Sequence, residues 1–106
     1  MDIVEFLSQR IKEDEAAAQR LLSDRSVSES GKWYEWRLLR ECEAKRRLLG
    51  ITESARQAAL ATMISSAARD LPWIPEVIEW TTLSLNALAL PYSDHPDFQD
   101  AWKLSP

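Results

Sequence analysis

The side chains that could do chemistry gather near the end of the sequence, where the only histidine lies among carboxylates. His95 stands in the segment Asp94-His95-Pro96-Asp97, and such a histidine can act as a general acid or base or as a metal ligand. A zinc site needs further histidine or cysteine ligands, and the sequence has one cysteine and no second histidine. Asp94, Pro96 and Asp97 suit the first turn of a helix, so we interpret Asp94 as an N-cap and His95 as a surface residue.

Acidic residues at helical spacing are a second candidate, because carboxylates on one helix face can bind Mg²⁺ or Mn²⁺. Glu76 and Glu79 have this spacing, and so do Asp94, Asp97 and Asp100. Prolines interrupt the second set, and the sequence lacks the flanking pattern of all-α nucleotide pyrophosphohydrolases. A small metal-dependent hydrolase that uses helix carboxylates is therefore an alternative hypothesis, and we predict no bound metal or cofactor.

Basic residues between Arg37 and Arg47 suggest contacts to phosphate groups. Glu41 and Glu43 lie among them at the spacing that forms ion pairs along a helix, and the net charge of −4 gives no general attraction to nucleic acid. We expect a solvated, salt-bridged helix, with weak nucleic-acid binding as a second alternative. Lys45 shares a face with apolar residues, a setting that either perturbs a lysine or lets its stem lie along them.

Tryptophan is the compositional outlier, with five residues at positions 33, 36, 73, 80 and 102. Tryptophan fills protein cores, and it is also enriched at the hot spots of interfaces. Aromatic and polar residues mix in two stretches, one around Trp33 and one after Pro91. We predict one partner-binding surface that joins both stretches, made of Trp33, Tyr34, Trp36, Arg40, Tyr92, Asp94, His95, Phe98 and Trp102.

Long stretches without glycine or proline predict helices over 3–22, 33–49, 52–69, 75–90 and 95–102. The first begins at a capping box, Asp2 with Glu5, and carries an apolar stripe of Ile3, Leu7, Ile11, Ala18 and Leu22. The polar stretch 23–32 is predicted to be a loop. Gly50 is predicted to end the second helix, and Thr52 to cap the third.

The third predicted helix is rich in alanine, which leaves room for a neighbouring helix to pack closely. Its predicted inner face consists of Ala55, Ala58, Ala59, Leu60, Met63, Ile64 and Ala67. A rigid connector with two prolines follows at 70–75, and Ile74, Val77, Ile78, Leu85 and Leu88 of the fourth helix should face inward. We predict an all-α fold, a compact four-helix bundle with a short C-terminal helix, in a single domain over 1–106.

Composition points to an ordinary globular protein, at 45% hydrophobic and 28% charged residues. Cys42 is alone, so no intrachain disulfide can form, and a reducing compartment suits the chain. The first residues lack the basic and apolar regions of a signal peptide, and no apolar run approaches about 18 residues. We therefore expect a cytoplasmic protein that does not enter membranes.

Three blocks of the sequence resemble a family of small uncharacterised proteins of actinobacteria and their phages, a domain of unknown function. They span 2–15, which begins Asp2-Ile3-Val4-Glu5-Phe6-Leu7, then 38–49, and then 85–102, which includes Pro91-Tyr92-Ser93-Asp94-His95-Pro96. Members often carry a histidine after the second block and further Cys or His before the third. Here those places hold Gly50-Ile51 and the alanine-rich helix, so no metal chemistry is carried over.

These observations favour a non-enzymatic protein-interaction module. Because the family includes phage proteins, the resemblance implies a phage- or prophage-encoded factor that binds and modulates a host protein. Aromatic anchors surrounded by acidic residues would select a basic partner. A homodimer through a tryptophan-bearing face is the other kind of partner that we expect.

Overall fold

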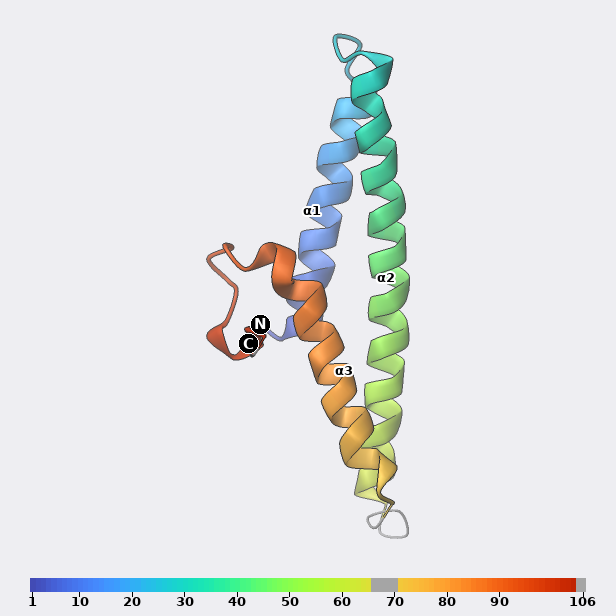
Figure 1. The fold of residues 1–106 in the computed structure, drawn as a ribbon, viewed down its shortest axis with the longest axis vertical. Coiled ribbons are helices and arrows are strands. Elements are labelled where there is room, and N and C mark those ends of the chain that lie inside the picture. Colours follow the sequence, from blue (N-terminus) through green and yellow to red (C-terminus); the bar gives the residue numbers. More distant parts are fainter. Residues whose placement is uncertain (66–70, 105–106) are drawn as a thin grey trace.

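The computed structural model describes residues 1–65 and 71–104, and every regular element in these ranges is helical (Figure 1). The elements are α1 (Ile3–Ser23), α2 (Glu29–Ile64) and α3 (Trp73–Ala89), followed by the 3₁₀ turns η1 (Leu90–Tyr92) and η2 (Asp100–Trp102). The predicted all-α class is confirmed. The molecule is elongated, 61 × 24 × 24 Å, because α2 runs along its whole length.

α1 and α2 form an antiparallel hairpin, and a capping side chain stands at the N-terminus of each helix. Asp2 caps α1 as predicted, since its Oδ1 accepts a hydrogen bond from the Glu5 N–H at 2.8 Å. Ser28 caps α2, and its Oγ accepts from the Gly31 N–H at 3.1 Å. In the loop between the helices, Asp24 Oδ1 accepts hydrogen bonds from the hydroxyl and the backbone N–H of Ser26. These bonds lower the pKa of the Asp24 carboxyl group. The loop is thus shorter than the predicted 23–32, because Ser28 starts the helix earlier.

α2 is one helix of 36 residues where two were predicted, so the four-helix bundle is wrong. Gly50 has a negative φ and ends nothing, and Thr52 lies buried in the helix interior instead of capping a new one. A glycine inside a helix costs about 1 kcal/mol relative to alanine, whereas burying Leu49 next to it contributes about 1.5–3 kcal/mol. Packing therefore carries the helix through Gly50. The predicted end of the third helix, at 69, lies outside the described residues.

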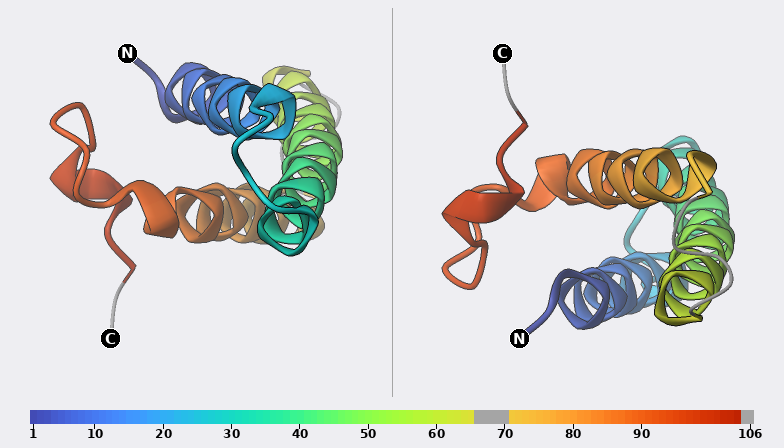
Figure 2. Two further views of the ribbon diagram at one scale, coloured as in Figure 1. Left: turned by 90° about the horizontal axis from the view of Figure 1, so that it is seen from above. Right: turned by 90° about the horizontal axis from the view of Figure 1, so that it is seen from below.

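The core lies where α3 crosses from α2 towards the start of α1. Seen along the long axis of the molecule, α1 and α3 lie on the same side of α2 (Figure 2). Its buried residues are Ile3, Phe6, Leu7, Ile11, Cys42, Leu49, Leu85, Ala89 and Trp102. The predicted stripe of α1 is confirmed, with four residues buried and Leu22 half-buried. The inward residues predicted for α3 are likewise all buried or half-buried.

The predicted C-terminal helix over 95–102 is wrong. Only the single turn η2 forms there, and residues 93–99 follow irregular backbone. Pro96 disfavours the helical conformation in the residue before it, His95, where the predicted helix was expected to begin. Asp94 is exposed and caps no helix, and η2 begins after Gln99 instead.

Within the described parts of the chain, no helix combines the length and the apolar character that a membrane crossing requires.

Candidate functional site

Residues 90–102, which we call the C-terminal clamp, wrap around one fully buried ring on α1. The Phe6 ring centroid lies 6.3 Å from that of Tyr92, 5.5 Å from His95, 6.2 Å from Phe98 and 4.9 Å from Trp102. Three of these pairs are edge-on, the arrangement that aromatic rings favour. Gln99 adds a hydrogen bond from its side chain to the Met1 carbonyl at 2.9 Å. Four predicted partner-binding residues thus contact the protein's own core.

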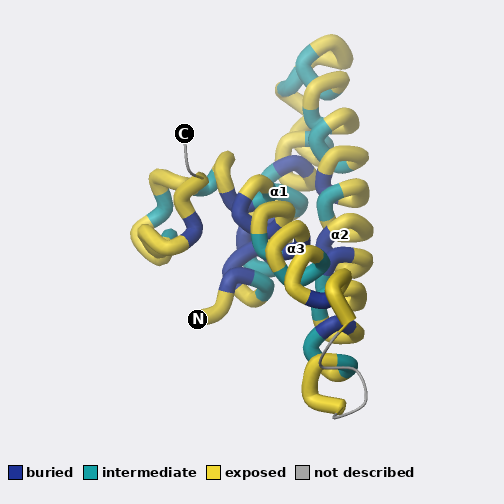
Figure 3. The backbone as a smooth tube through the Cα atoms, turned by 60° about the horizontal axis from the view of Figure 1, so that its bottom comes forward, coloured by how far each residue is buried: buried dark blue, intermediate teal, exposed yellow. Residues whose placement is uncertain are grey.

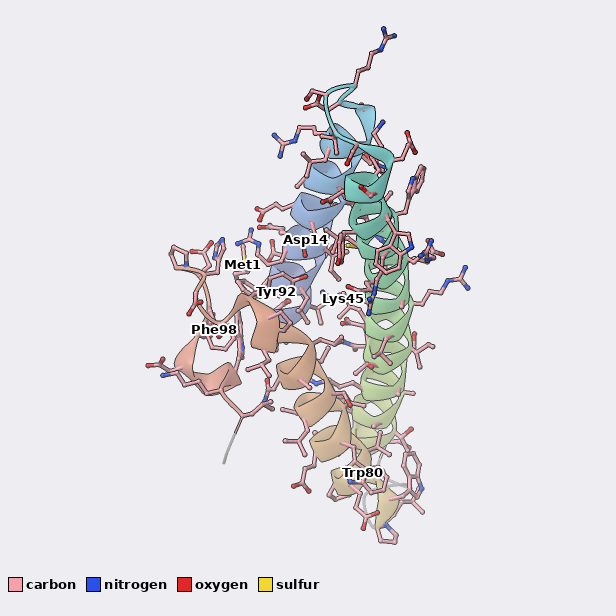
Figure 4. The ribbon with its side chains drawn as sticks, turned by 45° about the horizontal axis from the view of Figure 1, so that its top comes forward. Met1, Asp14, Lys45, Trp80, Tyr92 and Phe98 are labelled. Atoms are coloured by element: carbon pink, nitrogen blue, oxygen red, sulfur yellow. The ribbon has the colours of Figure 1, made fainter. Side chains whose placement is uncertain are left out.

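Tyr92 joins the clamp to both helices of the hairpin. Its Oη donates to Asp14 Oδ2 at 2.7 Å and accepts from Lys45 Nζ at 3.3 Å, and the three residues lie close together in Figure 4. Burial and the bond to Asp14 raise the pKa of Tyr92, so the phenol stays protonated and serves as a donor. Lys45 also lies 5.2 Å from the centre of the Tyr92 ring. The stem of Lys45 therefore follows the apolar face to Tyr92, while Glu41 pairs with Arg37 at 3.2 Å.

His95 is held by Arg10, whose side chain is buried on α1. The Arg10 guanidinium contacts both ring nitrogens of His95, pairs with Glu13 at 2.9 Å and lies 5.2 Å from the centre of the Phe6 ring. His95 Nδ1 also accepts from the Asp97 N–H at 3.0 Å. Because both ring nitrogens already have protein partners, His95 is a half-buried packing residue of the clamp.

The candidate nucleophile, Cys42, and the candidate metal-binding carboxylates do not lie together in one site. Cys42 is fully buried, and burial, followed by the nearby Asp14 carboxylate, raises the pKa of its thiol, which disfavours the reactive thiolate. The acids at 76, 79, 94, 97 and 100 are exposed. Among residues 1–65 and 71–104, no three His, Cys, Asp or Glu side chains gather closely enough to share a metal ion. The carboxylates proposed for a hydrolase do not converge in this part of the chain.

The other half of the predicted surface lies on α2 and is open to solvent. Trp33, Tyr34 and Trp36 are 51%, 67% and 54% exposed, and Arg40 is exposed beside them. The Trp33 and Tyr34 rings meet edge-on at 5.0 Å, and Arg37 lies 5.9 Å from the centre of the Trp33 ring. A shallow pocket follows, lined by Trp36, Leu39, Arg40 and Glu43.

The structure does not join the two halves into one surface. The clamp contacts α2 through Lys45, and the same Tyr92 hydroxyl also bonds Asp14 of α1, so Lys45 lies on the side of α2 that faces α1. Trp36 precedes Lys45 by two and a half helical turns and therefore points to the opposite side of α2. The aromatic residues of α2 and those of the clamp face in different directions.

The exposed side of α2 continues well beyond the tryptophans. We call it the outer face. Its residues recur at every third or fourth position and are the exposed Trp33, Arg37, Arg40, Ala44, Leu48, Ile51, Ala55 and Ala58 and the half-buried Thr62, with Trp36 at its edge. Leu48 and Ile51 are 47% and 68% exposed, and no exposed position between 48 and 64 is charged. Figure 3 shows this exposed side along α2. From Leu48 to Ile64 the exposed positions of α2 thus carry no charge, which is unusual for a solvent-facing helix surface.

The predicted inner face of the alanine-rich helix is largely wrong, because much of it belongs to the exposed side of α2. Ala59 is buried and Leu60 half-buried, whereas Ala55, Ala58, Met63 and Ile64 are exposed, and Ala67 lies outside the described residues. The residues that sequence reasoning missed are Leu48 and Ile51. Their signal is that they continue the spacing of Trp33, Arg40 and Ala44 towards the alanines.

The remaining tryptophans divide between the core and solvent. Trp102 is buried in the clamp, while Trp73 and Trp80 on α3 are 44% and 59% exposed. Trp80 lies on the half of α3 away from the clamp (Figure 4). It offers an exposed tryptophan outside the outer face, which makes it a matched control for Trp33 and Trp36.

Fold and surface together define a small all-α protein, a long helical hairpin braced by a third helix, with apolar and aromatic residues exposed along one side of α2. The chain belongs to a family of unknown function, DUF6221, whose model matches residues 1–104. No curated protein and no solved structure matches it.

Proposed function

We propose that this protein is a non-enzymatic protein-interaction module whose binding surface is the outer face of α2. One observation carries the proposal: exposed tryptophans and an uncharged apolar stretch share one side of a helix, and no other described element covers that side. Large apolar surfaces of this kind mark interaction sites, and tryptophan and arginine supply most of the binding energy at such sites.

The setting of this activity follows from the family resemblance. We propose a cytoplasmic factor, encoded by a phage or prophage of an actinobacterium, that binds a host protein and modulates it. Its partner would present an apolar helix or groove, because the outer face is straight and narrow.

Affinity capture with matched baits tests the proposal. Tagged protein and its W33A/W36A variant are used on an actinobacterial lysate, with Trp80→Ala as the control for loss of an exposed tryptophan. We expect one partner to be retained by the native protein and by Trp80→Ala, and to be lost with the double variant. Equal capture by all three baits would contradict the outer face as the binding surface.

The two alternatives give different signals. A metal-dependent hydrolase would be stabilised against heat by Mg²⁺ or Mn²⁺. Nucleic-acid binding through the basic residues between Arg37 and Arg47 would give an electrophoretic shift, and loss of that shift at modest salt would show that it is nonspecific.

A further inference from the structure

The outer face of α2 has a spacing that is complementary to itself. Counted from one end, its positions are 33, 37, 40 and 44; counted back from the other, they are 62, 58, 55 and 51. The two sets therefore coincide when a second α2 runs antiparallel and the centre lies between positions 47 and 48. This centre is close to the middle of α2, so almost the whole helix overlaps.

The side chains that meet in this register are large on one helix and small on the other. Trp33 lies opposite Thr62, Arg37 opposite Ala58, Arg40 opposite Ala55, and Ala44 opposite Ile51. Large side chains that face small ones let two helices interdigitate at close distance. The long stem of an arginine can also cover an alanine while its charged end remains in water.

We propose that a second copy of this chain covers the outer face, through antiparallel packing of two α2 helices about a twofold axis near Leu48. The dimer rests on the proposed function, since it uses the same face, and a host protein would bind that face in place of the second copy. A twofold axis makes both copies use the same residues, as in most homodimers. α1, α3 and the clamp lie on the other side of α2 and do not obstruct the contact (Figure 2).

Charge selects the antiparallel arrangement over a parallel one. In a parallel pair, Arg37 and Arg40 would face their own copies, which is a like-charge contact. In the antiparallel pair, the two copies of Arg40 are about 22 Å apart along the axis, at 1.5 Å per residue, well beyond the screening length of about 8 Å. Arg37 and Arg40 then meet uncharged residues of the partner, whereas the two exposed Arg47 side chains lie near each other beside the axis, each paired with Glu43 of its own chain at 2.9 Å.

The size of the contact predicts a dimer that dissociates on dilution. From Trp33 to Thr62 the outer face is about 44 Å long, and a helix surface is about 10 Å wide. The two copies together would bury roughly 900 Å² of surface if the helices are treated as smooth. This is close to the roughly 1,000 Å² that a specific interface requires. A dimer at this limit is concentration-dependent.

Cysteine cross-linking tests the register in the full-length protein. Facing Cα atoms of two closely packed helices are within the roughly 7 Å that a disulfide spans, whereas the two copies of residue 44 are about 10 Å apart along the axis. An equimolar mixture of Ala44→Cys and Ile51→Cys should form a disulfide-linked dimer, and neither variant should do so alone. Cross-linking of Ala44→Cys to itself as readily as to Ile51→Cys would overturn the register, and Ala87→Cys on α3 controls for random oxidation.

Sedimentation equilibrium tests the dimer and its charge contacts. Native protein should approach twice its 12.2 kDa mass as its concentration rises. Ala55→Arg, opposite Arg40, should weaken the dimer about tenfold or more, and adding Arg40→Glu to the same chain should restore it. Ala55 is exposed, so these variants keep the helical circular dichroism of the native chain, and Ala87→Arg is the control.

A native protein that stays monomeric at high concentration overturns the dimer, as does a failure of Arg40→Glu to rescue Ala55→Arg. Neither result affects the proposed function if the W33A/W36A bait still loses its partner. If the native and W33A/W36A baits capture the same proteins while the native chain dimerises, the dimer stands and the proposed external partner is contradicted.

Discussion

Replacing Gly50 by alanine should stabilise the protein. Gly50 lies inside α2 with a negative φ, and no atom lies within 4 Å of the place that a Cβ would occupy. Alanine therefore gains its helix propensity and meets no neighbour, so the free energy of unfolding should rise by about 0.5–1 kcal/mol. For a domain of this size, such a gain raises the melting temperature by about 3–6 °C.

Urea unfolding followed by far-ultraviolet circular dichroism measures this gain, and Gly31→Ala is the matched control. A Cβ on Gly31 would lie 3.1 Å from Val27 Cγ1 and 3.3 Å from Ser28 Oγ, the atom that caps α2. Alanine at this position gains propensity but crowds the cap, so Gly31→Ala should give a smaller gain than Gly50→Ala.

The sign of the Gly50 result decides between two folds. If Gly50 ended a helix in the left-handed conformation, as the sequence alone suggests, alanine would cost about 1–2 kcal/mol. A lower urea midpoint for Gly50→Ala, with an unchanged slope, would therefore refute the continuous α2 and the outer face that depends on it.

Two further predictions concern the clamp. Phe6→Ala removes the ring that four clamp side chains surround, so it should lower the free energy of unfolding by about 3–5 kcal/mol in urea, and a loss below about 1 kcal/mol would contradict the clamp. Burial and the bond to Asp14 raise the pKa of Tyr92, so above about pH 10 the folded protein keeps a proton that the unfolded chain loses, and stability falls as the pH rises. Urea midpoints at successive pH values should fall more steeply for native protein than for Tyr92→Phe, and equal slopes would count against the raised pKa.

Features that depend on neighbouring residues in the sequence could be predicted. The Asp2 cap and the stripe of α1 follow from spacing over a few turns, and α3 begins at its prolines close to the expected position. In each case the residues that decide the structure lie within one helix, so periodicity and capping chemistry contain the information.

The clamp could not be predicted in this way, because its contacts join residues far apart in the sequence. Arg10 and Asp14 have the spacing of an ion pair along α1, yet Arg10 pairs with Glu13 and contacts His95, and Asp14 accepts from Tyr92. An exposed pair of this kind contributes only about 0.3–0.5 kcal/mol, less than a buried, charge-assisted hydrogen bond. Tertiary partners therefore replace the local one, and nothing in the spacing identifies them.

α2 was misassigned for a different reason, because it carries two apolar stripes. Leu38, Cys42 and Leu49 face the core, while Leu48, Ile51 and the exposed alanines face solvent. Spacing shows that a stripe exists but not which neighbour covers it. The alanines suggested close packing against another helix, and within one chain this is wrong for Ala55 and Ala58. In the antiparallel dimer the same residues do pack against a helix, the partner's α2, so the alanine pattern then describes the assembled pair and not the single chain.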